Sequence, residues 1–534
     1  MFSSVGSWNL QISIRTGKDS VCPLLCNKRK YHDDPKLELD GSPIKILKEV
    51  KFLGVIFDSK LNFVPHITML KEKCMKALDV IKVVANTKWG ADKNTLLHLY
   101  RSLIRSKLDY GCIVYGAART SYIKALDAIH HQGLRLCIGA YRTSPVASLY
   151  VEANEPPLEL RRIKLLLQYI AKLKANPDNP AFDCVFDPQL EDFYDKNKKA
   201  IKSIALRVKK HLQDSNLNLE IAKPSTHSDI PPWQLLKPEV DTSLSEYKKS
   251  DTNPAVFKQK LLELKQSNPS TTEIYTDGSK DQGKVAAAAV TKNDIFSARL
   301  PNEASIFTAE AKAIQLAFEY IRISSKKHFT IFSDSLSCLQ SIRNMNIDHP
   351  YILGIVKKCY LLIKQNKIVE FCWIPSHIGI SGNTKAAKDA LKYDTAHFRL
   401  PYTDFKYLIK VYVNALWQNY WDFHDTNKLY SIQSKVNKPS NFILKRDDEV
   451  IISRLRIGHS KLTHSYLLNK EFQPECVSCN CPLSIYHILL ECCDYTPIRT
   501  RLFGNIQSMR DLFANIDYHM VLQYLHECDI YRKI

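Results

Sequence analysis

The sequence predicts a multidomain protein built around a central α/β domain, residues 271–394. A mainly helical region precedes this domain, and a small helical tail follows it. Three observations carry the prediction. Within residues 271–394, short apolar runs alternate with segments whose apolar residues recur at helical spacing. Helical spacing dominates the first part of the chain, and cysteines near the end recur at the intervals of metal ligands. The 534 residues are enough for about two to four domains.

The chain is strongly basic, with 75 lysines and arginines against 55 acidic residues and a formal charge of +20. This charge favours a polyanionic partner such as nucleic acid, although solvated surface lysines would give the same count. The 15 cysteines are too scattered for a small disulfide scaffold. The first residues lack signal-peptide features, and no run reaches the ~18 apolar residues of a membrane span. We therefore expect a nuclear or cytoplasmic protein with no membrane partner.

The first region, residues 1–182, opens with a short apolar run at 51–58 that reads as a strand or hairpin arm. Helical periodicity follows over 65–86 and 92–108. Aromatic and basic residues then alternate, as in grooves where rings stack on bases and cations meet phosphates. Ordinary amphipathic helices would produce the same alternation, so both readings stay open. The residues concerned are Tyr110, Tyr115, Arg119, Tyr122, Arg135, Tyr141 and Arg142.

A longer pattern in this region resembles a known family. Its first marker is Phe-Leu-Gly-Val at 52–55, and its second is Leu-Tyr-Arg-Ser-Leu-Ile-Arg-Ser-Lys-Leu-Asp-Tyr-Gly at 99–111. Further markers are Arg-Thr-Ser-Pro at 142–145 and Glu-Ala-Asn-Glu-Pro-Pro at 152–157. Together they resemble the segment after the catalytic palm in reverse transcriptases of jockey-like non-LTR retrotransposons. The resemblance implies that residues 1–182 are the palm end and the thumb, which holds a template–primer duplex.

One upstream motif imitates a polymerase site. Tyr31, His32, Asp33 and Asp34 fit the Tyr-x-Asp-Asp pattern, which needs a tight hairpin between apolar strands. Here four polar residues precede the motif and a proline follows it, which is typical of a loop. We therefore expect a solvated turn and no polymerase activity.

Residues 183–270 read as a connector, because four prolines between 224 and 238 break it into extended pieces. The central domain then follows in the order strand, strand, strand, helix, strand, helix, helix, strand, helix. This order predicts a five-stranded mixed sheet with flanking helices. The expected strands begin near residue 273 and cover 285–291, 295–300, 328–333 and 368–374; the expected helices cover 307–323, 336–344, 351–364 and 382–392.

Three acidic residues of this domain lie on separate core elements. Asp277 and Asp334 lie at or near strand ends, and Glu310 lies in the first turn of a helix. Singly, each has an ordinary explanation as a turn, a helix cap or a helix N-terminal charge. Together, carboxylates on rigid elements can hold two divalent ions, and hard oxygen ligands favour Mg²⁺ or Mn²⁺. We therefore predict that all three are catalytic and metal-binding.

The same order of elements resembles the ribonuclease H family over residues 271–394. Its markers lie at 275–279, 308–310, 332–335 and 373–383. The resemblance implies hydrolysis of RNA within an RNA–DNA hybrid and places Asp277, Glu310 and Asp334 at the first three metal-carboxylate positions. It also places His377 at the position of a mobile histidine that assists turnover in that family. The alternative is that His377 is a histidine with a packing role only.

The fourth carboxylate of that family is missing here. Ala387 stands where the acid is expected, and Asp389 lies about 200° around the helix from an equivalent position. One metal would therefore lose a ligand, and Lys385 or Lys388 would add repulsion nearby. We predict weak or absent cleavage.

After a helical connector, residues 395–445, the tail at 446–534 contains Cys476, Cys479, His487 and Cys492. The spacing Cys-x₂-Cys-x₇-His-x₄-Cys can surround one tetrahedral Zn²⁺, with Cys481 and Cys493 as spare ligands. A hairpin with reduced thiols is the alternative. The arrangement is similar to the Cys-Cys-His-Cys tail of the same retroelements.

The leading interpretation is a retrotransposon-derived ribonuclease that acts on RNA–DNA hybrids, impaired at Ala387. The second is a non-catalytic protein that binds hybrids or other nucleic acid through its basic surface. A third is a pseudogene product without a role.

Overall fold

The computed structural model describes residues 10–15, 20–25, 38–39 and 42–534, except for 187–201, 225–229, 249–250, 268–269, 377–382, 396–397 and 438–443. Contacts divide the chain into two compact units. The helical unit comprises Met1–Leu166, Leu190–Val208 and Val411–Ile534, and the sheet unit comprises Leu167–Gln189 and Lys209–Lys410. In the described part of the chain, every helix is too short or too polar to cross a lipid bilayer.

The sheet unit is built on a six-stranded mixed sheet with the strand order β11-β10-β9-β12-β13-β8. The strands β9, β10 and β11 form an antiparallel meander, and β12, β13 and β8 add to β9 in parallel. The strands are β8 (Glu239–Asp241), β9 (Thr272–Asp281), β10 (Lys284–Val290), β11 (Ile295–Leu300), β12 (His328–Ser333) and β13 (Ile368–Trp373).

The expected five strands are all present, and β8 is a sixth that corrects the predicted count. It comes from the connector and pairs in parallel with β13 through Val240 and Phe371. Three residues after a proline are too few to show the alternation that marks a strand. The pairing exists because the outer edge of β13 offers unpaired backbone groups, which is a tertiary feature.

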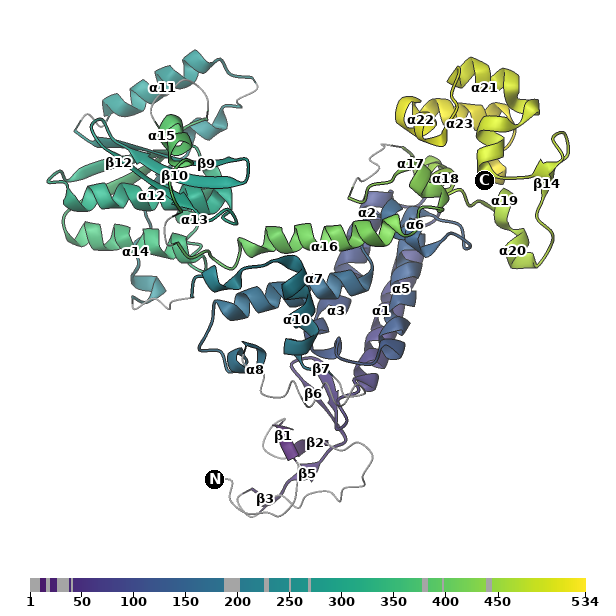
Figure 1. The fold of residues 1–534 in the computed structure, drawn as a ribbon, viewed down its shortest axis with the longest axis horizontal. Coiled ribbons are helices and arrows are strands. Elements are labelled where there is room, and N and C mark those ends of the chain that lie inside the picture. The colour runs from purple at the N-terminus through teal and green to yellow at the C-terminus, as the bar shows by residue number, and fades with distance from the viewer. Residues whose placement is uncertain are drawn as a thin grey trace. The chain divides into compact units, whose positions relative to one another are not determined.

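Helices cover both faces of this sheet. Figure 1 shows α12 (Ile306–Ile323) and α14 (Pro350–Lys364) against one face and α15 (Asn383–Ala390) against the other. Neighbouring side chains of β10 point to opposite faces of the sheet and therefore contact different helices. Ala289 belongs to the core formed with α12, and Ala288 packs against α15. Two further helices of this unit are α11 (Pro254–Ser267) and α13 (Leu336–Arg343).

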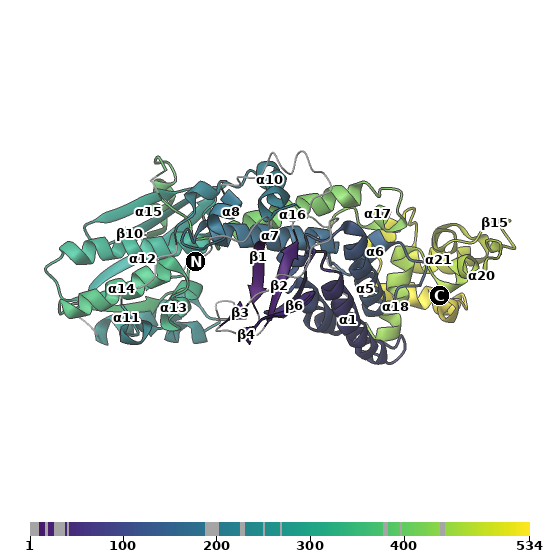
Figure 2. The same cartoon turned by 90° about the horizontal axis from the view of Figure 1, so that it is seen from below.

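In the helical unit, the strands β1 (Leu10–Arg15), β2 (Ser20–Leu25) and β5 (Lys45–Ile46) form a small sheet, and β3 (Glu38–Leu39) pairs with β4 (Ser42–Pro43). A hairpin follows, β6 (Glu49–Phe52) and β7 (Val55–Asp58), as the apolar run at 51–58 predicts. Figures 1 and 2 both show α1 and α5 side by side. The side chain of Asp92 caps α2 by accepting from two main-chain N–H groups. The helices up to residue 174 are α1 (Val64–Val84), α2 (Lys93–Tyr100), a π-helical turn (Arg101–Arg105), α3 (Ser106–Asp109), α4 (Cys112–Tyr115), α5 (Thr120–Ile138), α6 (Val146–Glu152) and α7 (Leu158–Lys174).

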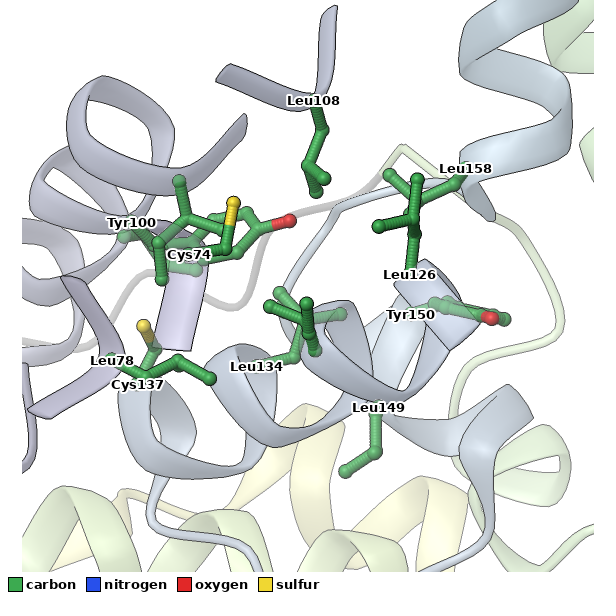
Figure 3. Close-up of a cluster of buried hydrophobic side chains, with 14 of the residues drawn as sticks. Cys74, Leu78, Tyr100, Leu108, Leu126, Leu134, Cys137, Leu149, Tyr150 and Leu158 are labelled. Atoms are coloured by element: carbon green, nitrogen blue, oxygen red, sulfur yellow. The ribbon is translucent and has the colours of Figure 1, made fainter. Parts of the chain in front are cut away.

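The sequence markers of this region contact one another. Tyr110 donates a hydrogen bond to the carbonyl of Leu53 over 2.5 Å, which joins the second marker to the first. Arg101 and Arg105 both bind the buried carboxylate of Glu155, at 2.5 and 2.7 Å, which joins the second marker to the last. Figure 3 shows the core beneath them, where Leu78, Tyr100 and Cys137 lie together with other apolar side chains of α1, α2 and α5.

The C-terminal elements belong to the same helical unit. They are α17 (Lys428–Ile432), α18 (Arg446–Ile457), α19 (Lys461–His464), α20 (Tyr466–Asn469), β14 (Glu475–Cys476), β15 (Cys481–Pro482), α21 (Thr496–Phe503), α22 (Met509–Asn515) and α23 (Tyr518–Glu527); α16 (Phe405–Asp422) connects the sheet unit to them.

A buried ion cluster fastens α18 to the N-terminal helices. Glu152, whose side chain is 0% exposed, pairs with Arg456 at 3.0 Å and with Lys93 at 3.5 Å. Ser453 also donates to Glu152, and the main-chain N–H of Lys93 donates to Glu449. Residues more than 300 positions apart in the chain thus share one set of buried charges.

Candidate active site and metal centres

The parallel pairing of β9 with β12 brings two of the predicted acids together. Ser333 is the register partner of Thr276, so the residues that follow them, Asp334 and Asp277, lie side by side. The hydroxyl of Thr276 donates to the carbonyl of Phe332 over 3.1 Å and ties the two strands at this point. The indole of Trp373 donates to the main-chain carbonyl of Asp334 over 3.1 Å and holds the end of β12.

Glu310 reaches the same point from the second turn of α12, one turn later than the sequence predicts, because the helix already begins at Ile306. This helix begins where the hydroxyl of Ser305 accepts from the main-chain N–H of Thr308. A β-carbon at Gly278 would lie 2.8 Å from the main-chain nitrogen of Glu310, so glycine allows β9 to approach the start of α12. In the sequence, Gly278 stands out only as part of the marker at 275–279.

A second residue outside the sequence prediction holds this helix. Asp404 is buried and accepts hydrogen bonds from Ser305 and Thr308 at 2.8 to 3.0 Å. It thereby caps the helix that carries Glu310. Asp404 lies beyond the expected end of the domain, and nothing in the local sequence indicates its partner.

The structure brings Asp277, Glu310 and Asp334 together, with one carboxylate oxygen of each within 4.8 Å of the others. Burial raises the pKa of Asp277 to about 7, and the charge of Asp334 adds to the rise. Burial also raises the pKa of Glu310 well above its usual range, with further contributions from Asp334 and Asp277. The Glu310 Oε2 atom is buried and has no hydrogen-bond partner among the described residues. Crowded, buried oxygens of this kind fit a divalent cation.

The raised pKa of Asp277 predicts a change in stability with pH. The unfolded carboxyl loses its proton near pH 4 and the folded one near pH 7, so without added divalent ions the free energy of unfolding should fall as pH rises between these values. Asp277→Asn removes this penalty and should stabilise the protein at pH 8, by at most about 4 kcal/mol, but little at pH 4.

Urea denaturation of both proteins at the two pH values measures this difference. The exposed Asp281→Asn on the same strand is the control and should change little. An Asp277→Asn variant no more stable than the parent at pH 8 would contradict the prediction.

The residue expected at the fourth position lies on α15. Ala387 is fully buried on α15 and packs with Ala288, the register partner of Asp277. The positive charge of Lys388, the next residue of α15, opposes the rise in the pKa of Asp277. Asp389 is partly exposed and pairs with Lys392. His377 lies outside the described residues.

The predicted zinc ligands also come together. β14 and β15 form a short hairpin, with Cys476 opposite Cys481, which turns the chain so that Cys479 lies beside Cys476. His487 and Cys492 lie at the two ends of the turn that follows. Ligand atoms of Cys476, Cys479, His487 and Cys492 all lie within 4.8 Å of one another. Three thiols and one imidazole at this spacing fit tetrahedral zinc.

The two spare cysteines lie at the rim of this cluster. The Cys493 sulfur is 3.4 Å from that of Cys479, and the Cys481 sulfur is 3.3 Å from Nδ1 of His487. Each is therefore close to one predicted ligand.

Comparison with known proteins gives a family for part of the chain. Residues 269–394 match the family model described as RNase H. The chain is 26% identical over 162 residues to the retrovirus-related Pol polyprotein from type-1 retrotransposable element R1 of Bradysia coprophila, which covers 30% of this chain and 16% of that protein. It is 24% identical over 176 residues to the RNA-directed DNA polymerase from mobile element jockey of Drosophila funebris, covering 33% and 18%.

A viral protein is similar over a shorter stretch. The Pol polyprotein of equine infectious anemia virus (isolate 1369) is 32% identical over 142 residues, covering 26% of this chain and 12% of the polyprotein. The matched stretches thus span less than a fifth of each of these relatives.

Proposed function

The chain carries an RNase H domain and is similar to polyproteins of non-LTR retrotransposons, and from this we propose that it binds RNA–DNA hybrids and hydrolyses their RNA strand slowly. One observation carries the proposal: Asp277, Glu310 and Asp334 place one oxygen each within 4.8 Å of the others, and the first two of these side chains are buried. A structural role does not require three acids to be gathered at one point, where burial and mutual repulsion disfavour their charged forms.

The three side chains have distinct supports. Asp277 and Asp334 are held by paired strands, and Glu310 is held by a helix whose start is capped by Ser305 and Asp404. Rigid supports of this kind keep ligand oxygens at fixed spacing. When bound, two divalent ions activate water and stabilise the leaving oxygen in phosphodiester hydrolysis, which here would leave a 5′-phosphate.

The test is metal-dependent cleavage of a labelled hybrid. Purified protein with Mg²⁺ or Mn²⁺ should cut the RNA strand of the hybrid and leave duplex DNA intact. Asp277→Asn should lower the initial rate by at least about 100-fold, because a metal ligand is lost, whereas the exposed Asp281→Asn should leave it unchanged. Cleavage that persists in Asp277→Asn would show that the activity comes from elsewhere.

A second function, binding without cleavage, is favoured by Ala387 and by the positive charge of Lys388, which acts on Asp277. Both weaken the case for a complete metal site. The result that selects it is hybrid binding that falls steeply with salt, with no cut product in either metal.

We also propose that Cys476, Cys479, His487 and Cys492 bind one structural Zn²⁺. The three cysteines are free thiols, and the short strands β14 and β15 bury little apolar surface of their own. A metal would therefore supply much of the local stability.

Metal analysis of the full chain should find about one zinc per molecule. Cys476→Ser should lose it and unfold this segment, because one of four ligands is removed. Cys528→Ser, a partly exposed free cysteine of the same unit, is the matched control, and Cys481→Ser and Cys493→Ser should keep the metal. The site would be contradicted if the purified protein contained no zinc and a chelator did not change its circular dichroism.

A further inference from the structure

A cavity of about 350 Å³ in the helical unit is lined by three arginines and by no acidic residue. It lies at the end of α5, where Arg135 and the following Arg142 meet Arg454 of α18. Gln132 and Thr87 add neutral polar groups to its wall. The positive charges repel one another because no acidic side chain lines the same cavity. A bound anion would reduce this repulsion.

Two of the guanidinium groups are fixed in place. Arg454 donates through Nε to the carbonyl of Gly139 at 2.9 Å and through a terminal nitrogen to the main-chain oxygen of Ile534 at 3.1 Å. Arg135 donates to the carbonyl of Ser144 at 3.3 Å. Its Nε atom is buried and has no partner among the described residues. Burial lowers the pKa of both Arg135 and Arg454, a penalty that an anion would offset.

The wall of the cavity is rigid because α5 and α18 are locked together. Gly139 ends α5 with φ +66°, and a β-carbon there would lie 2.3 Å from Val450 of α18, so only glycine fits. Arg446 donates to the carbonyls of Leu136 and Cys137 at 2.9 and 2.8 Å. Arg135 and Arg454 are therefore fixed in position before a ligand binds, which lowers the entropic cost of binding.

We propose that this cavity binds a phosphate group of a nucleic acid. Guanidinium groups present paired N–H donors that match phosphate oxygens, and the neutral donors of Gln132 and Thr87 suit the remaining oxygens. The formal charge of +20 favours a polyanion over a small acid. Trp89, two residues from Thr87, is 70% exposed and offers a ring on which a base can stack.

The site is independent of the three carboxylates, which belong to the sheet unit. The phosphate can be a terminal monoester or an internal diester, because both present the same oxygens to arginine. Duplexes that differ only in a 5′-phosphate distinguish the two sources.

The experiment measures anisotropy of labelled hybrid duplexes, with 5′-phosphate or 5′-hydroxyl ends, without Mg²⁺ so that no cleavage occurs. Arg142→Gln should weaken binding about ten-fold and reduce the slope of log affinity against log salt by about 0.9. Arg142 is exposed, so this variant should fold. Lys71→Gln is the control: it removes the same charge from an exposed residue of α1 in the same unit, and it should change neither quantity much.

The outcomes separate clearly. A loss confined to the phosphorylated duplex assigns the cavity to a terminal phosphate, and an equal loss with both duplexes assigns it to the backbone. As a second measurement, inorganic phosphate should raise the melting temperature of the parent protein above that in chloride of equal ionic strength, and Arg142→Gln should lose this shift. Equal effects of Arg142→Gln and Lys71→Gln on affinity and slope would overturn the proposal. A parent protein whose melting temperature does not change with phosphate would overturn it as well.

Discussion

Replacing Ala387 with aspartate should raise the rate of RNA cleavage within a hybrid by roughly ten-fold or more, the scale on which metal-site support affects activity. Ala387 is fully buried and packs with Ala288, which lies directly opposite Asp277 in the sheet. Residues opposite each other in antiparallel strands are about 5 Å apart, so a carboxylate on α15 would reach the three existing acids. It would also balance the charge of Lys388, which acts on Asp277.

The same substitution should make stability depend on metal. Without Mg²⁺, a fourth acid at this buried position should cost about 1–3 kcal/mol, and added Mg²⁺ should restore the loss. Ala386→Asp is the matched control: it places the same charge at the neighbouring, nearly buried position of α15, but about 100° around the helix.

Initial rates and melting temperatures with and without Mg²⁺ measure both effects. If Ala387→Asp cleaves no faster than the parent protein, or if Ala386→Asp gains as much, Ala387 does not limit the reaction.

Glu152→Gln should destabilise the helical unit by about 3–5 kcal/mol. The side chain of Glu152 is 0% exposed, and its two carboxylate oxygens bind Lys93, Ser453 and Arg456. The amide keeps the shape but removes the charge, so two almost fully buried cations lose their counter-charge. Because Lys93 precedes Glu152 and Arg456 follows it by 304 residues, the loss should loosen the C-terminal elements from the N-terminal helices.

Urea denaturation followed by circular dichroism measures the effect. The exposed Glu159→Gln, seven residues along the chain, is the control and should change stability by less than about 0.5 kcal/mol. A Glu152→Gln variant as stable as this control would show that the ion cluster contributes little.

Much of the sheet unit follows from local sequence. The limits of β11 and β12 agree with the predicted strands, and α12, α13, α14 and α15 lie within one or two residues of the predicted helices. These elements are long and regular enough for side-chain periodicity to reveal them. The short β8 was missed because its three residues form a strand only against the exposed edge of β13.

The candidate site divides in the same way. The residue types and order of Asp277, Glu310 and Asp334 indicated a metal site, and the register of β9 with β12 explains why two of them meet. Gly278 and Asp404 were not assigned their roles. Their importance depends on which helix lies beside them, and no pattern in neighbouring residues carries that information.

By itself, the sequence determined the chemistry available to this protein: three acids on separate elements, an alanine in place of a fourth, a Cys₃His set and an excess of basic residues. Only the tertiary structure decided which distant groups share a site. It joined Glu152 to Arg456 and gathered Arg135, Arg142 and Arg454 around one cavity. The reason is physical: periodicity reports which face of an element is apolar, whereas the pairing of buried charges depends on how those faces pack.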